Sequence, residues 1–80
     1  MDNFRKKIDA IDKNIVKLLL KRFDSAKRIG NYKRKNKIKI IDKKRELQVI
    51  KNIKTQSKLH QKFMINIFKA IMNYSKKIQK

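Results

Sequence analysis

Apolar residues in the first third of the chain recur at alternating steps of four and three residues. The positions that follow this spacing are Phe4, Ile8, Ile11, Ile15 and Leu18. Side chains at these intervals lie on one face of an α-helix. We therefore expect a helix that begins near the N-terminus and carries a continuous apolar stripe along one side.

The predicted first helix is long, because no proline interrupts the pattern before about Asn36. Gly30 weakens it by only ~1 kcal/mol relative to alanine. About 33 residues at ~1.5 Å each make a rod of ~50 Å, whereas a compact domain of this size has a radius of gyration near ~12 Å. One chain cannot wrap such a rod, so we expect a second copy to cover part of the stripe in an intertwined homodimer.

A connector and a second helix are predicted after the rod. Residues 36–41 alternate β-branched and polar side chains, a pattern typical of extended backbone. Asp42 then offers a carboxylate suited to cap the N-terminus of a helix that runs to roughly residue 52. The residues of this helix that we expect to face inward are Leu47, Ile50 and Ile53.

A polar joint at residues 55–57 is expected to precede a third helix over about residues 58–78. The predicted apolar face of this helix consists of Phe63, Met64, Ile67, Phe68, Ile71 and Met72. Ser75 and Gln79 continue the same face one and two turns further on. The pattern therefore predicts an all-α fold of three helices in a single domain, residues 1–80.

Composition narrows the class of protein. The chain has no cysteine, which excludes disulfides and thiolate metal sites. The charged N-terminus lacks the apolar segment of a signal peptide, and no apolar run approaches the ~20 residues of a membrane span. We expect a cytoplasmic protein with no membrane partner, and no motif suggests a metal or a cofactor.

The net charge of +19 raises the alternative of a small basic helical nucleic-acid-binding protein. However, twenty of the 25 basic residues are lysines, spread over nearly every exposed helical position rather than gathered into one stripe. The sequence also lacks a recognisable helix-turn-helix turn or an aromatic stacking platform. Nucleic acid is therefore not the partner that we expect.

Three cations, Arg5, Arg22 and Lys33, lie near the apolar stripe of the first helix. Arg22 and Lys33 are ~16 Å apart along the axis and can both reach a small molecule between them. Arg5 is ~25 Å from Arg22, but in an antiparallel dimer the partner's Arg5 can approach Arg22. Buried cations need anions, and the chain has six acidic residues, with Glu46 as its one glutamate. We therefore expect a ligand that carries two or more carboxylates or phosphates.

Four segments along the chain resemble the all-helical class of chorismate mutases. The opening FRKKIDAIDKNIVKLLLKR has one arginine early and another after the leucine run, and IGNYK ends in the lysine of that family. IDKKRE carries an aspartate, an arginine and a glutamate at the family's spacing, and YSKKIQ places a serine and a glutamine four residues apart. The matching positions occur in order, although the interval from Glu46 to Ser75 is a few residues shorter than in the enterobacterial enzymes.

The resemblance implies an activity and a way of binding substrate. Chorismate is a dianion, and its rearrangement to prephenate is intramolecular, so no nucleophile, general base or cofactor is required. Arg22 and the partner's Arg5 would hold the two carboxylates, because a guanidinium matches a carboxylate with two parallel hydrogen bonds. Arg45 would support this charge network, and Ser75 would contact a carboxylate.

The remaining roles implied by the resemblance concern the bond that breaks and the ring hydroxyl. Lys33 and Gln79 would donate hydrogen bonds to the ether oxygen as negative charge develops on it, so the expected catalytic residues are Arg22, Lys33 and Gln79. Glu46 and the backbone of Asp42 would meet the ring hydroxyl. An isochorismate-pyruvate lyase of the same fold is a second alternative, and Glu46 favours chorismate.

Overall fold

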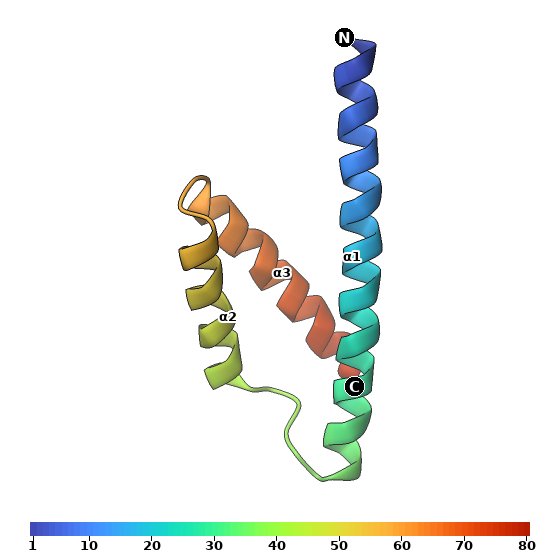
Figure 1. The fold of residues 1–80 in the computed structure, drawn as a ribbon. Coiled ribbons are helices and arrows are strands. Elements are labelled where there is room, and N and C mark those ends of the chain that lie inside the picture. Colours follow the sequence, from blue (N-terminus) through green and yellow to red (C-terminus); the bar gives the residue numbers. More distant parts are fainter.

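A computed structural model describes all 80 residues as three helices and two connections (Figure 1). Helix α1 spans Asp2–Lys35, α2 spans Lys43–Gln56, and α3 spans Gln61–Gln79. The molecule measures 53 × 24 × 15 Å, with a radius of gyration of 15.3 Å instead of the ~12 Å of a compact chain. The predicted all-α fold with one very long first helix is confirmed.

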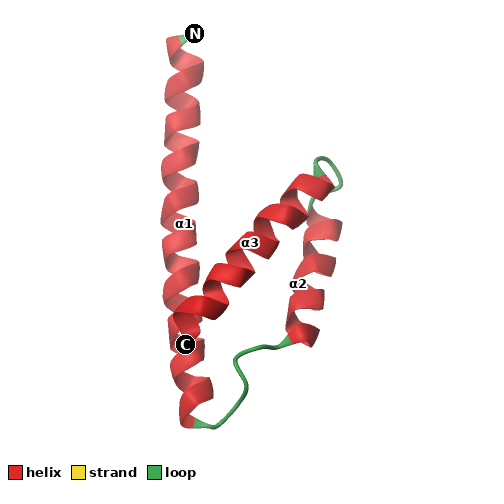
Figure 2. Ribbon diagram, turned by 180° about the vertical axis from the view of Figure 1, so that it is seen from behind, coloured by secondary structure: helices red, strands yellow, loops and turns green.

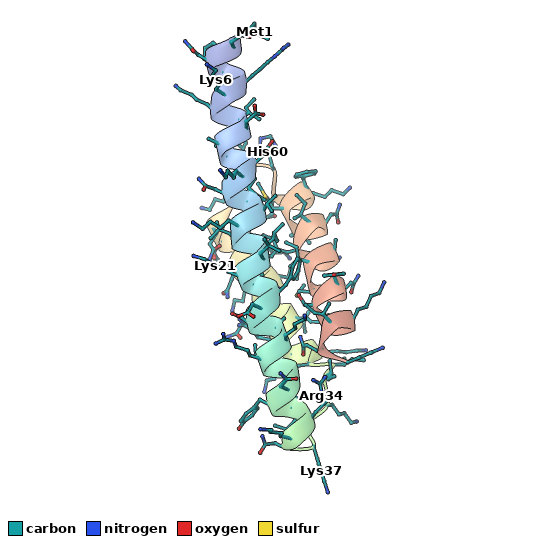
Figure 3. The ribbon with its side chains drawn as sticks, turned by 90° about the vertical axis from the view of Figure 1, so that its right-hand side faces the viewer. Met1, Lys6, Lys21, Arg34, Lys37 and His60 are labelled. Atoms are coloured by element: carbon teal, nitrogen blue, oxygen red, sulfur yellow. The ribbon has the colours of Figure 1, made fainter.

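Helices α2 and α3 form a hairpin that leans against the C-terminal half of α1 (Figures 1 and 2). α3 packs against both other helices, whereas α1 and α2 do not pack against each other. The N-terminal turns of α1, which carry Met1 and Lys6, project beyond the hairpin (Figure 3). No helix combines the length and the hydropathy that a membrane span requires.

Few side chains are buried within one chain. The core consists of Val49 and Ile53 of α2 and Met72 of α3, with partly buried neighbours around them. α1 joins α3 through an edge-to-face contact between the rings of Phe23 and Tyr74, whose centroids are 4.9 Å apart. No large side chain is fully buried, so one copy makes only a thin core.

The apolar stripe predicted for the first helix lies on one face of α1 and is uncovered. Its members Phe4, Ile8, Ile11, Ile15 and Leu18 are each between 50% and 67% exposed, and every residue from 1 to 18 is exposed. A soluble helix normally buries such a face against another element. No element of the same chain reaches this one.

The end of α1 differs from the predicted start of an extended connector. Lys37 has a φ of 54°, and its N–H donates to the carbonyl of Arg34 at 3.4 Å. The N–H of Ile38 donates to the carbonyl of Lys33 at 2.8 Å. These two bonds form a Schellman motif, which satisfies the last carbonyls of a helix and usually has glycine at the left-handed position. Residues 36–37 are therefore a turn, and the extended connector follows it.

The predicted joint between the second and third helices is displaced towards the C-terminus. α2 continues to Gln56, because the hydroxyl of Thr55 donates to the carbonyl of Asn52 at 2.8 Å and the N–H of Ser57 donates to Ile53 at 2.9 Å. The polar residues there complete the last turn instead of breaking it. α3 starts at Gln61, after an exposed His60 in the left-handed region with φ 56°.

The buried face of α2 is rotated from the predicted one, and part of the predicted face of α3 is exposed. Leu47, expected inside, is 72% exposed, and the inner face centres on Val49 and Ile53. Six helical steps place Leu47 about 120° around the axis from Ile53, whereas four steps return close to the same face. On α3, Phe63 is likewise 63% exposed within one chain.

Candidate active site

A cavity of about 260 Å³ lies between the C-terminal third of α1, the start of α2 and the end of α3. Seven of the eight predicted substrate-binding residues line it, namely Arg22, Lys33, Asp42, Arg45, Glu46, Ser75 and Gln79. The eighth, Arg5, lies ~25 Å from Arg22 along the rod. The shorter interval between the second helix and the last turns therefore does not prevent Ser75 and Gln79 from reaching the cavity.

Arg22 and Ser75 are joined across α1 and α3. The guanidinium Nη1 of Arg22 donates to Ser75 Oγ at 3.1 Å, and Ser75 Oγ donates to the carbonyl of Ile71 at 2.8 Å. Ser75 is buried, so its hydroxyl fixes the position of the arginine. Partial burial first, and the charge of Arg45 second, lower the pKa of Arg22. An anion between the two guanidinium groups would act in the opposite direction, because a nearby negative charge favours the protonated form of Arg22.

Lys33 reaches the cavity from the last turn of α1. Its Nζ donates to the carbonyl of Ile40 at 3.1 Å. This bond holds the side chain against the connector between α1 and α2. An ammonium group carries three donors, so two remain for other partners. The connector thus orients the lysine without consuming its capacity to bind.

Asp42 and Arg45 form the N-terminal turn of α2. The carboxylate Oδ1 of Asp42 accepts a hydrogen bond from the N–H of Arg45 at 3.0 Å, so the predicted N-cap is confirmed. The Arg45 guanidinium donates to Gln48 Oε1 at 2.8 Å. The carboxylate of Asp42 is therefore occupied by the cap, and the guanidinium of Arg45 is oriented by its own helix.

Glu46 is paired with a residue that the sequence did not single out. Lys76 Nζ lies 3.5 Å from Glu46 Oε2, and the two side chains are 29% and 31% exposed. Lys76 lines the cavity, but in a chain with so many lysines its position gave little signal. The one clue was its place next to Ser75 and three residues before Gln79, within the turn that faces the cavity.

Gln79 is 9% exposed, and its side-chain oxygen Oε1 has no hydrogen-bond partner within the protein. A buried polar atom without a partner costs about 1–3 kcal/mol. The amide lines the cavity, so a ligand group that donates a hydrogen bond to Oε1 would recover that cost. Gln79 is therefore prepared to contact a ligand.

The charges around the cavity fit a dianion. Cations outnumber acids by four to two, the cations being Arg22, Lys33, Arg45 and Lys76 and the acids Asp42 and Glu46. The surplus of two positive charges favours a ligand with two negative ones. Fold and cavity together define an all-helical protein with a cavity whose charge suits a small dianionic molecule.

Comparison with known proteins agrees with this class. A family profile described as chorismate mutase type II matches residues 4–80. A chorismate mutase of Methanocaldococcus jannaschii is 35% identical over 79 residues, which covers 95% of this chain and 80% of that protein. No solved structure matches the chain. The chain belongs to the chorismate mutase type II family, and the resemblance and the enzyme class inferred from the sequence are confirmed.

Proposed function

We propose that the protein rearranges chorismate to prephenate in the cavity between its three helices. The observation that carries the proposal is the convergence of seven predicted site residues on one cavity with two surplus positive charges. Membership of the chorismate mutase type II family supports the same reaction. The residue roles below are part of the proposal.

The cationic side of the cavity binds the two carboxylates. Arg22 holds one carboxylate. The hydroxyl of Ser75, already bonded to Arg22 at 3.1 Å, donates to the same ligand group when its proton turns away from the carbonyl of Ile71. Arg45 contributes positive charge beside them. Arginine suits this task, because its planar fork makes two parallel hydrogen bonds to a carboxylate.

Lys33 and Gln79 act on the breaking ether bond. Both line the cavity, and each can donate to an oxygen that becomes more negative in the transition state. Fixed donors in a water-poor site lower the barrier most when the charge that they meet develops during the reaction. Together with selection of the folded substrate conformer, they can supply the ~8 kcal/mol that a millionfold acceleration requires.

The ring hydroxyl is read at the start of α2. Glu46 accepts from it, and the backbone of Asp42 lies beside it. The ion pair of Glu46 with Lys76 at 3.5 Å restrains the carboxylate in that orientation. This contact distinguishes a substrate with its hydroxyl in the chorismate position.

The active protein is a homodimer in which Arg5 is shared across the interface. Each residue of the stripe on α1 is at least half exposed in a single chain. Monomeric soluble proteins rarely expose a contiguous apolar surface of this length. An antiparallel second copy covers the stripe and brings the partner's Arg5 to the cavity beside Arg22. The second carboxylate of the substrate is then held by two chains.

The direct test is the loss of chorismate absorbance when purified protein is added, with prephenate identified as the product. Gln79→Ala should slow the reaction strongly, whereas Gln56→Ala, at an exposed position at the end of α2, should not. Isochorismate and random-sequence DNA are the comparison ligands. Turnover of isochorismate alone, or DNA binding without any turnover, would contradict the proposal.

A further inference from the structure

The last turn of α3 lies unusually close to α1 at Gly30. A Cβ atom built on Gly30 would lie 2.8 Å from both Cα and Cβ of Gln79 and 2.9 Å from its carbonyl oxygen. Side-chain carbons essentially never approach other atoms so closely, and two of these contacts are with backbone atoms. The φ of Gly30 is not in the left-handed region, so the glycine serves the approach of the helices and not a special backbone conformation.

Arg34, one turn further along α1, bonds to the same residue of α3. Its Nη1 donates to the carbonyl oxygen of Gln79, and its Nη2 donates to Oδ1 of Asn31. Figure 3 shows Arg34 on α1 beside the end of α3. The last carbonyls of a helix have no partner within it, and a cation near them is favourable. Asn31 orients the guanidinium, and Arg34 completes the end of α3.

We propose that Gly30 and Arg34 are positioning residues that hold the last turn of α3 against α1 and so fix the Gln79 side chain in the cavity. Gly30 permits the close approach, and Arg34 binds the carbonyl that the approach brings within reach. The inference rests on the proposed function in one respect, which is that Gln79 donates to the reacting ether oxygen. Neither Gly30 nor Arg34 lines the cavity, so their effect on the reaction passes through Gln79.

Such a support matters because the amide of Gln79 can act as a donor only if it is held precisely in the cavity. Helix ends fray, and Gln79 is the last helical residue of α3. A displacement of about 1 Å in a positioning element can cost about 10²-fold in rate. Substrate affinity depends chiefly on the cations of α1 and α2, so loss of the support should lower kcat more than it raises KM.

Arg34→Met is the main test, because it keeps an unbranched stem that suits a helix and removes the guanidinium donors. We expect kcat to fall about 10-fold or more while KM changes less than about 3-fold. Arg34→Lys should recover part of the loss, since lysine can donate to the same carbonyl. The matched control is Arg28→Met, which removes an exposed arginine of the same helix that pairs with Asp24 at 3.2 Å. It should leave both constants unchanged.

Gly30→Ala tests the close approach independently. Alanine favours the helix more than glycine, so the variant should remain helical while the end of α3 is pushed away from α1. We expect kcat to fall as in Arg34→Met, with circular dichroism unchanged. Full activity in Gly30→Ala would show that α3 does not need this approach, and would overturn that half of the proposal.

A double-mutant cycle decides whether Arg34 acts through Gln79. In a Gln79→Ala background, Arg34→Met should cause no further loss of kcat, because the side chain that it positions is already gone. If the two losses multiply instead, Arg34 acts elsewhere and the proposal is wrong.

Amide hydrogen exchange separates this inference from the proposed function. Arg34→Met should speed exchange in residues 76–79, and Arg28→Met should not. If Arg34→Met shows faster exchange but Gln79→Ala is fully active, Arg34 does stabilise the end of α3, and the catalytic role of Gln79 is refuted. Unchanged exchange in Arg34→Met would refute the support itself.

Discussion

The two halves of α1 have the same periodicity but opposite surroundings. From residue 1 to residue 18 every position is exposed, although five apolar side chains follow a single face. From Arg22 onward the same face meets α3, buries Ala26 and Gly30, and lines the cavity. One continuous helix therefore has one half that its own chain covers and another that it does not.

The contrast explains why cations sit on an apolar stripe. At Arg22 and Lys33 the stripe meets the cavity, and each side chain has a hydrogen-bond partner there. Arg5 lies on the uncovered half, where every residue is exposed. In the proposed dimer the N-terminal half of α1 is covered by the second chain and brings its Arg5 to that chain's cavity. Dimer formation and activity therefore depend on the same helix.

The largest effect should follow from charging the uncovered half. The wild-type protein should be a dimer at micromolar concentration with no stable folded monomer, and Ile11→Asp should abolish both the dimer and the activity. A carboxylate buried in the interface without a partner costs about 3 kcal/mol or more. Sedimentation equilibrium and circular dichroism measure the result. The control is Lys13→Asp, on the opposite side of the same turn, which should remain a dimer; a well-folded wild-type monomer would contradict the comparison.

Mixing two inactive variants tests whether the halves belong to one site. Arg5→Ala and Arg22→Ala should each lose about 10²-fold or more in activity, because each leaves a buried carboxylate without its cation. After subunit exchange, an equal mixture should regain about one quarter of the wild-type activity, since half of the dimers have one intact pocket. If heterodimers form and the mixture stays inactive, Arg5 and Arg22 do not share a pocket.

A third prediction concerns the covered half and its contact with the end of α3. Gln79→Glu should lose about 10²-fold in kcat at neutral pH, the effect of losing one donor to a developing oxyanion, and should recover as the pH falls. Only the protonated carboxyl can donate, whereas the wild-type amide donates throughout. The wild-type profile should be nearly flat from mildly acidic to neutral pH. Superimposable kcat–pH profiles for the two proteins would exclude Gln79 from the ether oxygen.

The smallest effect is expected at the rim of the cavity. Lys76→Met should raise KM about 2- to 5-fold, because a partly exposed ion pair contributes about 1 kcal/mol or less, and should change kcat little. Lys77→Met is the matched control, since Lys77 does not line this cavity. Equal KM values for Lys76→Met and wild type would show that the pair with Glu46 does not orient the substrate.

The boundaries of α2 show which structural features the local sequence can predict and which it cannot. The start of α2 at Asp42 could be predicted, because an N-cap is a bond between neighbours along the chain. The end of α2 could not, since Thr55 and Ser57 are equally suited to breaking a helix and to completing its last turn. The sequence predicts Leu47 on the inside for a related reason: apolar side chains indicate which face of a helix is buried, but the helix packed against it decides which of them are covered.

The sequence by itself determined three helices, the length of α1, its apolar stripe and the residue types of the candidate site. These follow from periodicity, capping and charge, which act within a few turns of one helix, and from ordered motifs that resemble one family. The tertiary structure alone decided that Lys76 joins Glu46 and that the end of α3 lies against Gly30 and Arg34. Such contacts depend on the angle and distance between helices. The packing of α3 against α1, at Gly30 and between the rings of Phe23 and Tyr74, sets that geometry, and no local pattern in the chain records it.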